Sequence, residues 1–470
     1  MRKIVRNLVF SFWILVSSCD FGDTNVDPSS LSDAPVNQIL PAALAQTARN
    51  MGSIGARISG VVIQHFQGND AQPLAYNNYL IDETAFDDFW RTGLYAGAMK
   101  DCSIIIEEGK TQDIPHYTGI AKILMAINLG IATSFWGDVP YSKAFQGNLN
   151  LKPEYDTQED LYGMIQTLLD EAIVELNMDG GFSPGVDDLI YGGNRALWVG
   201  TARALKARYY MHLVKRDPEA HTKALMALSG GTIFSNGVQP EFPFGELQNE
   251  ANPIAYFGED RLNQLVLSPY LLNLLDTRND PRKDFYTRFV SGIYVLYVRN
   301  DKTDNVTDLY WGQFDSPMPL ISFSELQFIR AEANMRSGVI SAAQNFLDQA
   351  VRSNMEVMGI SEGEITAYLA ANTDLAGLPN DEARIQRIIE QKFVAMFGQG
   401  TLEAWTDYRR TGYPVLSPSP DASESFDPSK VIPQRYLYPI SERNTNKVNV
   451  EAAIESQGGH LLDQPLWAFE

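Results

Sequence analysis

Apolar residues recur at helical spacing along most of the chain, and this periodicity limits the folds that the chain can adopt. The predicted helices cover residues 35–66, with breaks at Gly52, Gly55 and Gly60, and residues 83–108, 117–136, 157–176, 195–216, 218–229, 322–336, 341–358, 381–397 and 401–410. Thr157 precedes Asp160 by three residues, which is the pattern of a helix-capping hydroxyl. The pattern therefore indicates a mostly α-helical protein.

A long segment, residues 231–320, interrupts the helices. It is rich in Pro, Asn, Gly and aromatic residues, with a short predicted helix at 271–275 and a predicted strand pair at 285–299. From Tyr413 the chain is again rich in proline and irregular. We therefore expect a helical body that carries long irregular loops and a little β-structure in the insertion.

One predicted helix pair has small residues in its seam. Ala331, Gly338, Ala343, Leu347 and Ala350 follow the spacing of a tetratricopeptide-type hairpin, in which small side chains let two helices approach closely and stack on the next pair. An ordinary antiparallel helix pair with alanines in its seam would show the same residues.

The first nineteen residues have the features of a lipoprotein signal. Arg2, Lys3 and Arg6 precede a short apolar run, and small residues stand immediately before Cys19. We expect residues 1–18 to be a signal peptide, Cys19 to carry palmitate and other acyl chains, and residues 19–33 to form a flexible stalk. An ordinary secretory signal with a chance cysteine is the alternative. No later apolar run is expected to cross a bilayer.

The charge balance excludes some partners. The formal net charge is −21, and loss of the three basic residues of the signal would make it more negative. A surface this acidic argues against nucleic acid or anionic lipid headgroups as partners, and it favours neutral ligands, cationic ligands or contacts bridged by divalent metal. The only other cysteine, Cys102, precedes an apolar run and is expected to be buried, so no disulfide is expected.

Four further stretches carry a family resemblance when they are taken in order. They are Phe135-Trp136-Gly137-Asp138-Val139-Pro140-Tyr141, Ser324-Glu325-Leu326 with Arg330-Ala331-Glu332-Ala333, Glu403-Ala404-Trp405 with Asp407-Tyr408-Arg409-Arg410, and Arg435-Tyr436-Leu437-Tyr438-Pro439-Ile440 with Glu442 and Asn446. Together with Cys19 they resemble the SusD/RagB-like nutrient-binding lipoproteins of Gram-negative outer membranes.

This resemblance implies a fold and a role. It implies that residues 34–470 form a single α-helical domain of tetratricopeptide-like units with the insertion at 231–320. It also implies a lipid-anchored place in the outer membrane, facing the exterior, beside a SusC-like TonB-dependent transporter. Members of the family capture oligosaccharides, or in some branches peptides, and perform no chemistry.

The sequence offers little for catalysis or metal binding. The five histidines lie far apart, and neither a zinc-ligand spacing nor a nucleophile elbow nor a phosphate-binding glycine loop is present. The oxygen-rich run 301–308 lacks the glycine and the terminal glutamate of an EF-hand, so neither metal nor cofactor is expected. Glu403 and Asp407 could act as a glycosidase pair, but Arg409 and Arg410 would keep both ionised.

A sugar site needs flat apolar faces and nearby amides, and aromatic residues on loops are the best candidates. The predicted ligand-binding residues are Tyr76, Asn77, Asn78, Tyr79, Tyr294, Tyr297, Tyr310 and Trp311. The leading hypothesis is therefore an oligosaccharide-binding protein. A peptide or glycopeptide ligand, a helical glycoside hydrolase and a structural scaffold are the alternatives.

Overall fold

The computed structural model describes residues 34–231, 233–296 and 312–470. The predicted signal peptide, Cys19 and the stalk lie outside the described residues. So do Tyr297, Tyr310 and Trp311 among the predicted ligand-binding residues, and the oxygen-rich run 301–308.

The first half of the chain is a layered set of helices, as the periodicity predicts. They are α2 (Val36–Gly52), α3 (Ile54–Val62), α4 (Ala71–Asn77), the π-helix η3 (Phe89–Ala98), α5 (Met99–Glu108), α6 (Pro115–Trp136), the 3₁₀ turn η4 (Gly147–Leu149), α7 (Gln158–Leu176), α8 (Arg195–His212) and α9 (Ala220–Ser229). The predicted cap of α7 is confirmed, because the Thr157 hydroxyl accepts a hydrogen bond from the Asp160 backbone N–H.

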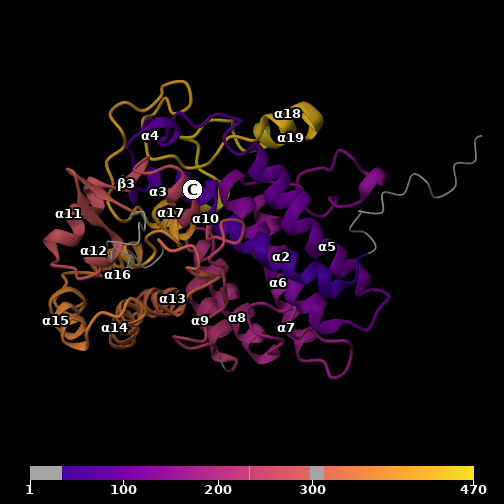
Figure 1. Ribbon diagram of the computed structural model, residues 1–470, viewed down its shortest axis with the longest axis horizontal. Helices are drawn as coiled ribbons and strands as arrows, with labels where there is room; N and C mark the ends of the chain where they lie inside the picture. Colours follow the sequence, from indigo (N-terminus) through magenta and orange to yellow (C-terminus); the bar gives the residue numbers. More distant parts are fainter. Residues whose placement is uncertain (1–33, 232, 297–311) are drawn as a thin grey trace, which may run out of the picture.

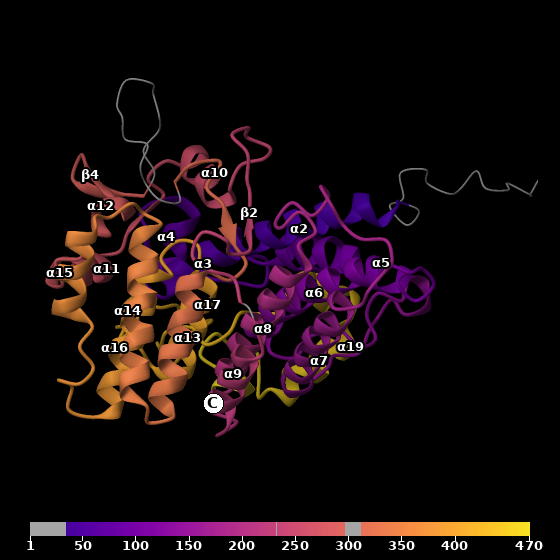
Figure 2. The ribbon, with the colours of Figure 1, turned by 90° about the horizontal axis from the view of Figure 1, so that it is seen from below.

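The insertion contains short elements, as expected. They are β2 (Glu241–Phe242), α10 (Pro253–Asp260), β3 (Leu265–Leu267), α11 (Pro269–Thr277), α12 (Lys283–Tyr286), β4 (Arg288–Val290), β5 (Ile293–Val295) and β6 (Met318–Pro319). Strands β3, β5 and β4 join β1 (Phe66–Gly68) in an antiparallel sheet with the order β1-β3-β5-β4. Strands β2 and β6 form a separate pair. Strand β4 is therefore an edge strand. In Figure 2, β4, α10 and α12 lie together on one side of the molecule.

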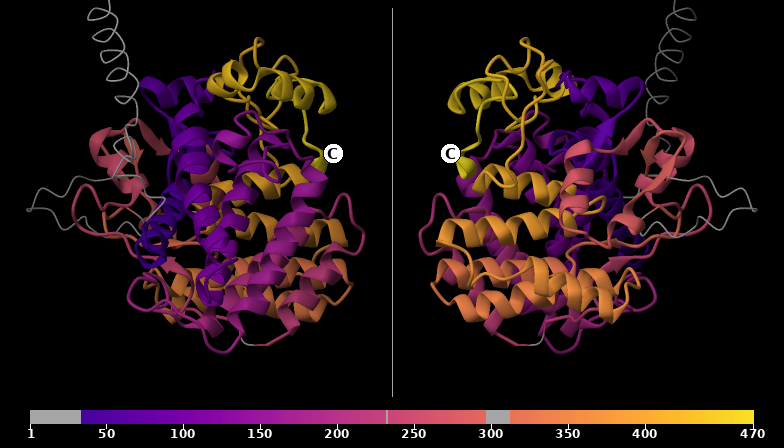
Figure 3. Two further views of the ribbon diagram at one scale, coloured as in Figure 1. Left: turned by 90° about the vertical axis from the view of Figure 1, so that its right-hand side faces the viewer. Right: turned by 90° about the vertical axis from the view of Figure 1, so that its left-hand side faces the viewer.

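The second half is built from helical hairpins. Its elements are α13 (Phe323–Arg336), α14 (Ile340–Glu356), α15 (Glu362–Asn372), α16 (Asp381–Ala395), α17 (Thr401–Thr411), α18 (Ile440–Thr445), α19 (Lys447–Ser456) and the 3₁₀ turn η5 (Trp467–Phe469). Figure 1 shows α13 to α16 side by side at the lower left and α18 and α19 at the top. Figure 3 shows the C-terminal segment, in yellow, lying over one end of the helical body.

The predicted tetratricopeptide-like hairpin is α13 with α14. Ala331, Ala343, Leu347 and Ala350 are buried in its seam. Gly338 has a positive φ of +75° in the turn, a conformation that glycine adopts without strain. The mostly α-helical fold with tetratricopeptide-like hairpins, long loops and a little β-structure is therefore confirmed.

Three expectations about helices are wrong. Residues 83–108 form no single helix: the chain bends at Gly97, where a Cβ atom would lie 2.3 Å from the Thr92 carbonyl oxygen. Helix α15 was not predicted, although its capping box of Ser361 and Glu364 was visible in the sequence. Helices α18 and α19 were likewise missed in the segment read as irregular.

The expectation that no apolar run after the signal is long enough to cross a bilayer is wrong for helix α6. By length and composition it is the one helix of the described ranges that could span a membrane, but 94% of its apolar window is buried inside the protein. Its side chains pack on all sides because α5, α7, α2 and α8 surround it. Helix α6 is therefore the central helix of a core that runs without interruption from Val36 to Phe469.

Candidate functional site

The motif stretches meet inside the protein and hold its two halves together. The Trp136 indole N–H donates to the Leu437 carbonyl oxygen at 2.9 Å, and Arg435 donates to the Trp136 carbonyl oxygen at 3.1 Å. The Trp405 indole N–H donates to the Pro433 carbonyl oxygen at 2.8 Å. Since these side chains are buried, the motifs that carry the family resemblance are structural.

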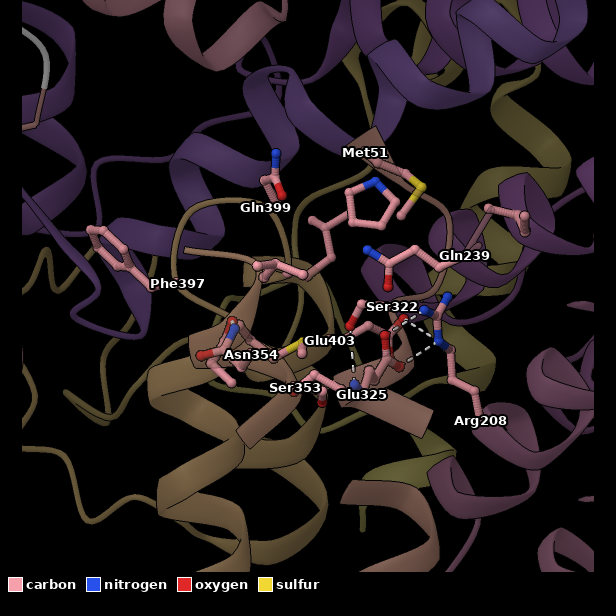
Figure 4. A pocket seen from close by; sticks show the side chains of 18 of the residues that line it. Met51, Arg208, Gln239, Ser322, Glu325, Ser353, Asn354, Phe397, Gln399 and Glu403 are labelled. Atoms are coloured by element: carbon pink, nitrogen blue, oxygen red, sulfur yellow. Dashed lines mark hydrogen bonds and ion pairs between the residues drawn. The ribbon is translucent and has the colours of Figure 1, made fainter. Parts of the chain in front are cut away.

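A narrow cavity with both charged and apolar side chains in its wall lies where α8, α13, α14 and α17 meet (Figure 4). Arg208 forms two hydrogen bonds of 2.7 Å with the Glu325 carboxylate, and its Nε lies 3.8 Å from Glu403. The second carboxylate oxygen of Glu403 lies 2.8 Å from His212 Nε2. Amide and hydroxyl side chains of residues such as Gln239 and Ser322 complete the wall.

The size and the charges of this cavity indicate a structural role. Its volume of about 50 Å³ holds a few water molecules, whereas ligand pockets typically have roughly 300–1,000 Å³. Burial alone would raise the pKa of Glu403, but Arg208 and His212 outweigh it and hold that pKa well below its usual range. Glu403 therefore stays ionised and does not offer the protonated acid that glycoside hydrolysis requires.

The described part of the chain shows no metal-binding group. Within residues 34–231, 233–296 and 312–470, no three His, Cys, Asp or Glu side chains lie close enough together to hold a metal ion. Cys102 is buried as expected, and burial raises the pKa of its thiol strongly.

The predicted cluster 76–79 is a structural junction. The rings of Tyr76 and Tyr79 are buried, and burial raises the pKa of both hydroxyls to about 12. Tyr76 lies in α4 and not on a loop as the sequence suggested, while the ligand-binding role of the cluster stays a prediction. Asn78 accepts a backbone hydrogen bond from Ser423 through its carbonyl oxygen, so the cluster fastens the C-terminal loop to α4.

Asn77 acts in the same junction through its side chain. Its Oδ1 accepts from the Gly68 N–H at 2.9 Å, and its Nδ2 donates to the Gly68 carbonyl oxygen at 2.6 Å. Residue 68 must be glycine for the two segments to lie this close, because a Cβ atom there would clash with the Pro73 carbonyl oxygen at 1.9 Å. The amide thus closes the turn between β1 and α4.

We expect Asn77→Ala to lower the free energy of unfolding by about 1–3 kcal/mol, because it leaves two backbone groups of Gly68 without partners. Urea titration of the wild type and the variant measures this loss. Asn148→Ala, on an exposed loop, is the control and should change stability by less than about 0.5 kcal/mol. A stable Asn77→Ala variant that loses glycan affinity would instead favour the original ligand-binding assignment.

Tyr294 lies on β5, next to the edge strand β4 of the sheet. It stands directly opposite Phe289 in the β4–β5 hairpin, and the two ring centroids are 4.9 Å apart. The Phe289 side chain is 64% exposed, whereas Tyr294 is half-buried. The Lys283 ammonium lies 5.4 Å from the centroid of the Tyr294 ring. We call Lys283, Phe289 and Tyr294 the aromatic edge.

The turn of the hairpin explains this arrangement. Ser291 and Gly292 both have positive φ, 50° and 94°, as in the two-residue turns that fix hairpin register. This register places Phe289 and Tyr294 on the same face as Leu267 and Phe66, which are buried further into the sheet. The face therefore runs from the core to the half-buried Tyr294 and the exposed Phe289.

Sequence reasoning identified Tyr294 but missed Phe289. The signal was present, because residues 285–299 were read as a strand pair and a two-residue turn at 291–292 sets Phe289 opposite Tyr294. Tyr256 on α10 is a further partly exposed ring of the insertion. Helix α10 packs beside the sheet, separated from it by a cavity of about 20 Å³ that Phe257 and Leu265 line.

The protein is thus a helical scaffold with buried ion pairs and an aromatic sheet edge on its loop-rich face. The chain belongs to the SusD-like family, whose model, described as "Starch-binding associating with outer membrane", matches residues 28–439. This membership confirms the resemblance seen in the sequence motifs. It places the chain among surface glycan-binding proteins associated with the outer membrane.

Solved structures share the fold of this chain. A chitin-binding protein superposes with a TM-score of 0.76 at 25% sequence identity, covering 92% of this chain and 100% of that one. A SusD homologue from Bacteroides uniformis has a TM-score of 0.75 at 23% identity, covering 92% and 99%. A SusD/RagB family protein from Bacteroides thetaiotaomicron has a TM-score of 0.72 at 23% identity, covering 92% and 98%. The comparison with curated proteins gives no match.

Proposed function

We propose that the protein is a lipoprotein, anchored through Cys19 on the exterior of the outer membrane, which binds oligosaccharides and passes them to a SusC-like TonB-dependent transporter. The observation that carries the proposal is the aromatic edge on a scaffold of this family. Phe289 offers an exposed flat face for the C–H side of a sugar ring, and Tyr294 adds a hydroxyl beside it.

The role in the proposal is binding without chemistry. Glu403, the carboxylate that the glycosidase alternative requires, is paired with His212 and lies near Arg208 in a cavity too small for a sugar. Asp407 lies 2.6 Å from Arg410 and 2.9 Å from Lys392. Glu403 and Asp407 therefore both lie beside basic side chains in the folded protein, which supports the non-catalytic role.

The choice of ligand follows from the comparisons. The family description names starch, and one similar structure is a chitin-binding protein. Oligosaccharides of N-acetylglucosamine and malto-oligosaccharides are therefore the first ligands to test, and peptides are the comparison class. We expect dissociation constants in the micromolar to millimolar range, about 4–8 kcal/mol of binding free energy.

Phe289→Ala is expected to weaken binding of the preferred oligosaccharide about tenfold, a loss of about 1.4 kcal/mol, because the stacking face is removed. Isothermal titration calorimetry measures the change. Phe182→Ala is the control, since Phe182 is also an exposed aromatic residue but lies on another loop. Unchanged affinity in Phe289→Ala would remove the aromatic edge from the proposed site.

The transporter role needs a separate experiment. The tagged lipoprotein would be purified from mild-detergent membranes, and the co-eluting proteins identified by mass spectrometry. We expect a large TonB-dependent barrel in near-equal amount. Recovery of the lipoprotein alone would contradict the delivery role while leaving glycan binding in place.

A further inference from the structure

A second pocket lies between the loop that joins α4 to η3 and the C-terminal segment. It is open to solvent, and its volume of about 410 Å³ falls in the range of roughly 300–1,000 Å³ that is typical of ligand pockets. We call it the C-terminal pocket, and its wall includes both charged and apolar side chains: Glu83, Phe426, Ile440, Arg443, His460 and Leu461. None of them belongs to the aromatic edge.

Hydrogen bonds hold the two segments of the pocket together. The Ile440 N–H donates to the Glu83 carbonyl oxygen at 3.1 Å. The Arg443 guanidinium donates to the Glu83 carboxylate and, at 2.9 Å, to the carboxylate of Glu451. The pocket is therefore built by segments that lie more than 300 residues apart in the chain, and it does not belong to a single loop.

The His460 ring presents a hydrogen-bond donor to the pocket. Its Nε2 accepts from the Tyr438 N–H at 2.6 Å, and burial together with Arg435 and Arg443 lowers the pKa of the ring to about 3. The ring is therefore neutral at pH 7, and its single proton is on Nδ1. Nδ1 lies 3.6 Å from the Glu83 carboxylate, beyond the length of a hydrogen bond. Within the described ranges this N–H is thus available to a ligand.

Acceptors lie beside this donor. Asp82 Oδ1 accepts from the Thr84 N–H at 2.9 Å and from its hydroxyl at 2.6 Å, so Asp82 Oδ2 has no partner in the described part of the chain. Glu83 uses Oε1 for Arg443 and leaves Oε2 for a ligand. The hydroxyl of Ser425, another residue of the wall, is exposed. The pocket therefore offers donors and acceptors together.

The rest of the wall is apolar. Phe426 and Leu461 are half-buried, and Ile440 is 37% exposed. A pyranose ring has C–H groups that pack against such surfaces, above all against an aromatic ring, and its hydroxyl groups both donate and accept hydrogen bonds. The wall of the C-terminal pocket matches both properties of a sugar.

The charges of the pocket favour a neutral ligand. Asp82 and Glu83 outnumber Arg443, which Glu451 also neutralises, so an anionic ligand is disfavoured. A cation would lie beside the Arg443 guanidinium and the His460 N–H, which both present hydrogen atoms. No group of three potential metal ligands lies in the described ranges. A neutral ligand with hydroxyl groups can use the donors and the acceptors at once.

We infer that the C-terminal pocket is a second sugar-binding site, which takes a mono- or disaccharide unit of a neutral glycan. The inference rests on the glycan binding in the proposed function, and it adds a site that shares no residue with the aromatic edge. In this site Asp82 and Glu83 accept hydrogen bonds from sugar hydroxyls, and His460 Nδ1–H donates one. The Phe426 ring packs against the C–H face of the sugar.

Saturation-transfer NMR tests the inference with the mature chain carrying Cys19→Ser and Phe289→Ala, because this variant lacks the stacking face of the aromatic edge. The probes are the neutral disaccharides maltose, cellobiose and N,N′-diacetylchitobiose. A blocked diglycine peptide and the diamine putrescine represent a peptide and a cation. We expect at least one disaccharide to bind, with a dissociation constant in the millimolar range, and neither comparison compound to bind.

Two further variants test the wall of the pocket. Asp82→Asn with Ser425→Ala removes a charged acceptor and a hydroxyl, and should weaken disaccharide binding about fivefold. Phe426→Leu keeps an apolar side chain but loses the flat ring, and should weaken binding by a similar factor. Asp179→Asn with Ser235→Ala is the matched control, because both positions are exposed and outside the pocket. Equal thermal midpoints would show that all variants are folded.

Three results would overturn the inference: no disaccharide binds to the Phe289→Ala protein, neither pocket variant weakens the binding, or only the peptide or the diamine binds. If Phe289→Ala still reduces oligosaccharide binding in those cases, the proposed function stands without the second site. Disaccharide binding that the pocket variants reduce and Phe289→Ala leaves unchanged would support the pocket and count against the aromatic edge.

Discussion

Replacing Arg410 with methionine is expected to lower the free energy of unfolding by about 3–5 kcal/mol, because it leaves carboxylates buried without their main partner. Arg410 forms two hydrogen bonds of 2.5 Å with Glu332 on α13 and two more, at 2.6 and 2.9 Å, with Asp407 on its own helix, α17. Its side chain is almost entirely buried. The arginine therefore links the tetratricopeptide-like hairpin to the motif helix.

The electrostatics of Glu332 show how strong this link is. Burial alone would raise the pKa of its carboxyl, but Arg410 and Arg336 lower that pKa to about 2. Without Arg410 the carboxylate keeps only Arg336, at 2.8 Å, as a cationic partner. The desolvation cost of Glu332 then goes largely uncompensated.

Urea unfolding of Arg410→Met and of the wild type measures the loss. Arg91→Met is the matched control, because Arg91 pairs with Asp88 at 3.0 Å on the exposed surface and should contribute less than about 1 kcal/mol. Arg410→Lys should fall between the two, since an ammonium cannot reproduce the forked geometry. A loss of less than about 1 kcal/mol in Arg410→Met would contradict the role assigned to the network.

A similar network fastens the insertion to the hairpins. Arg282, fully buried, donates to Asp280 within the insertion, to Asn354 on α14, to Tyr368 on α15 and to Gln391 on α16. The aromatic edge begins with Lys283, the first residue of α12 and the residue that follows Arg282. The structural ion pairs of the scaffold thus hold the base of the loop-rich face in a fixed position.

The sequence predicted local features better than long-range ones. Periodicity located α6 and α13, and the alanine seam identified the α13–α14 hairpin, since each depends on residues close together in the chain. The bend at Gly97 depends on the approach of the Thr92 carbonyl oxygen, and the spacing of apolar residues does not encode it.

The candidate site shows the same limit. Tyr76 and Tyr79 come after a polar stretch that predicts a loop, yet their rings are buried. The C-terminal segment, more than 300 residues later in the chain, reaches this cluster, where the Ser419 N–H donates to the Tyr79 hydroxyl. Phe289 was missed although the strand pair was predicted, because its exposure depends on β4 being an edge strand. Strand order is a property of the whole sheet, so the local pattern that sets Phe289 opposite Tyr294 could not show that Phe289 is exposed.

Acidification from pH 7 to pH 5 is expected to destabilise the protein by about 2 kcal/mol for each of two histidines, the buried His65 and the partly buried His460. Burial lowers the pKa of His65 to about 3, and burial together with Arg435 and Arg443 lowers that of His460 to about 3. The unfolded chain takes up these protons near pH 6.5. Below that value it binds more protons than the folded state, so stability is complete above pH 6.5 and is lost progressively toward pH 3.

The contacts explain why both rings resist protonation. His65 Nε2 lies 2.8 Å from the Phe393 carbonyl oxygen, to which it donates, so the other ring nitrogen is an unprotonated, buried atom without a partner. His460 Nε2 accepts a hydrogen bond of 2.6 Å from the Tyr438 N–H, within the last motif stretch. A second proton would bury an unpaired cation in the first case and break this hydrogen bond in the second.

Urea unfolding at pH 7 and pH 5 separates this effect from that of the carboxylates, most of which titrate below pH 5. His65→Gln and His460→Gln should each remove about 2 kcal/mol of the difference between the two pH values, whatever they do to stability at pH 7. His221→Gln, a half-buried position on α9, should leave the difference unchanged. If all three variants show the same pH dependence, neither His65 nor His460 controls the loss of stability between pH 7 and pH 5.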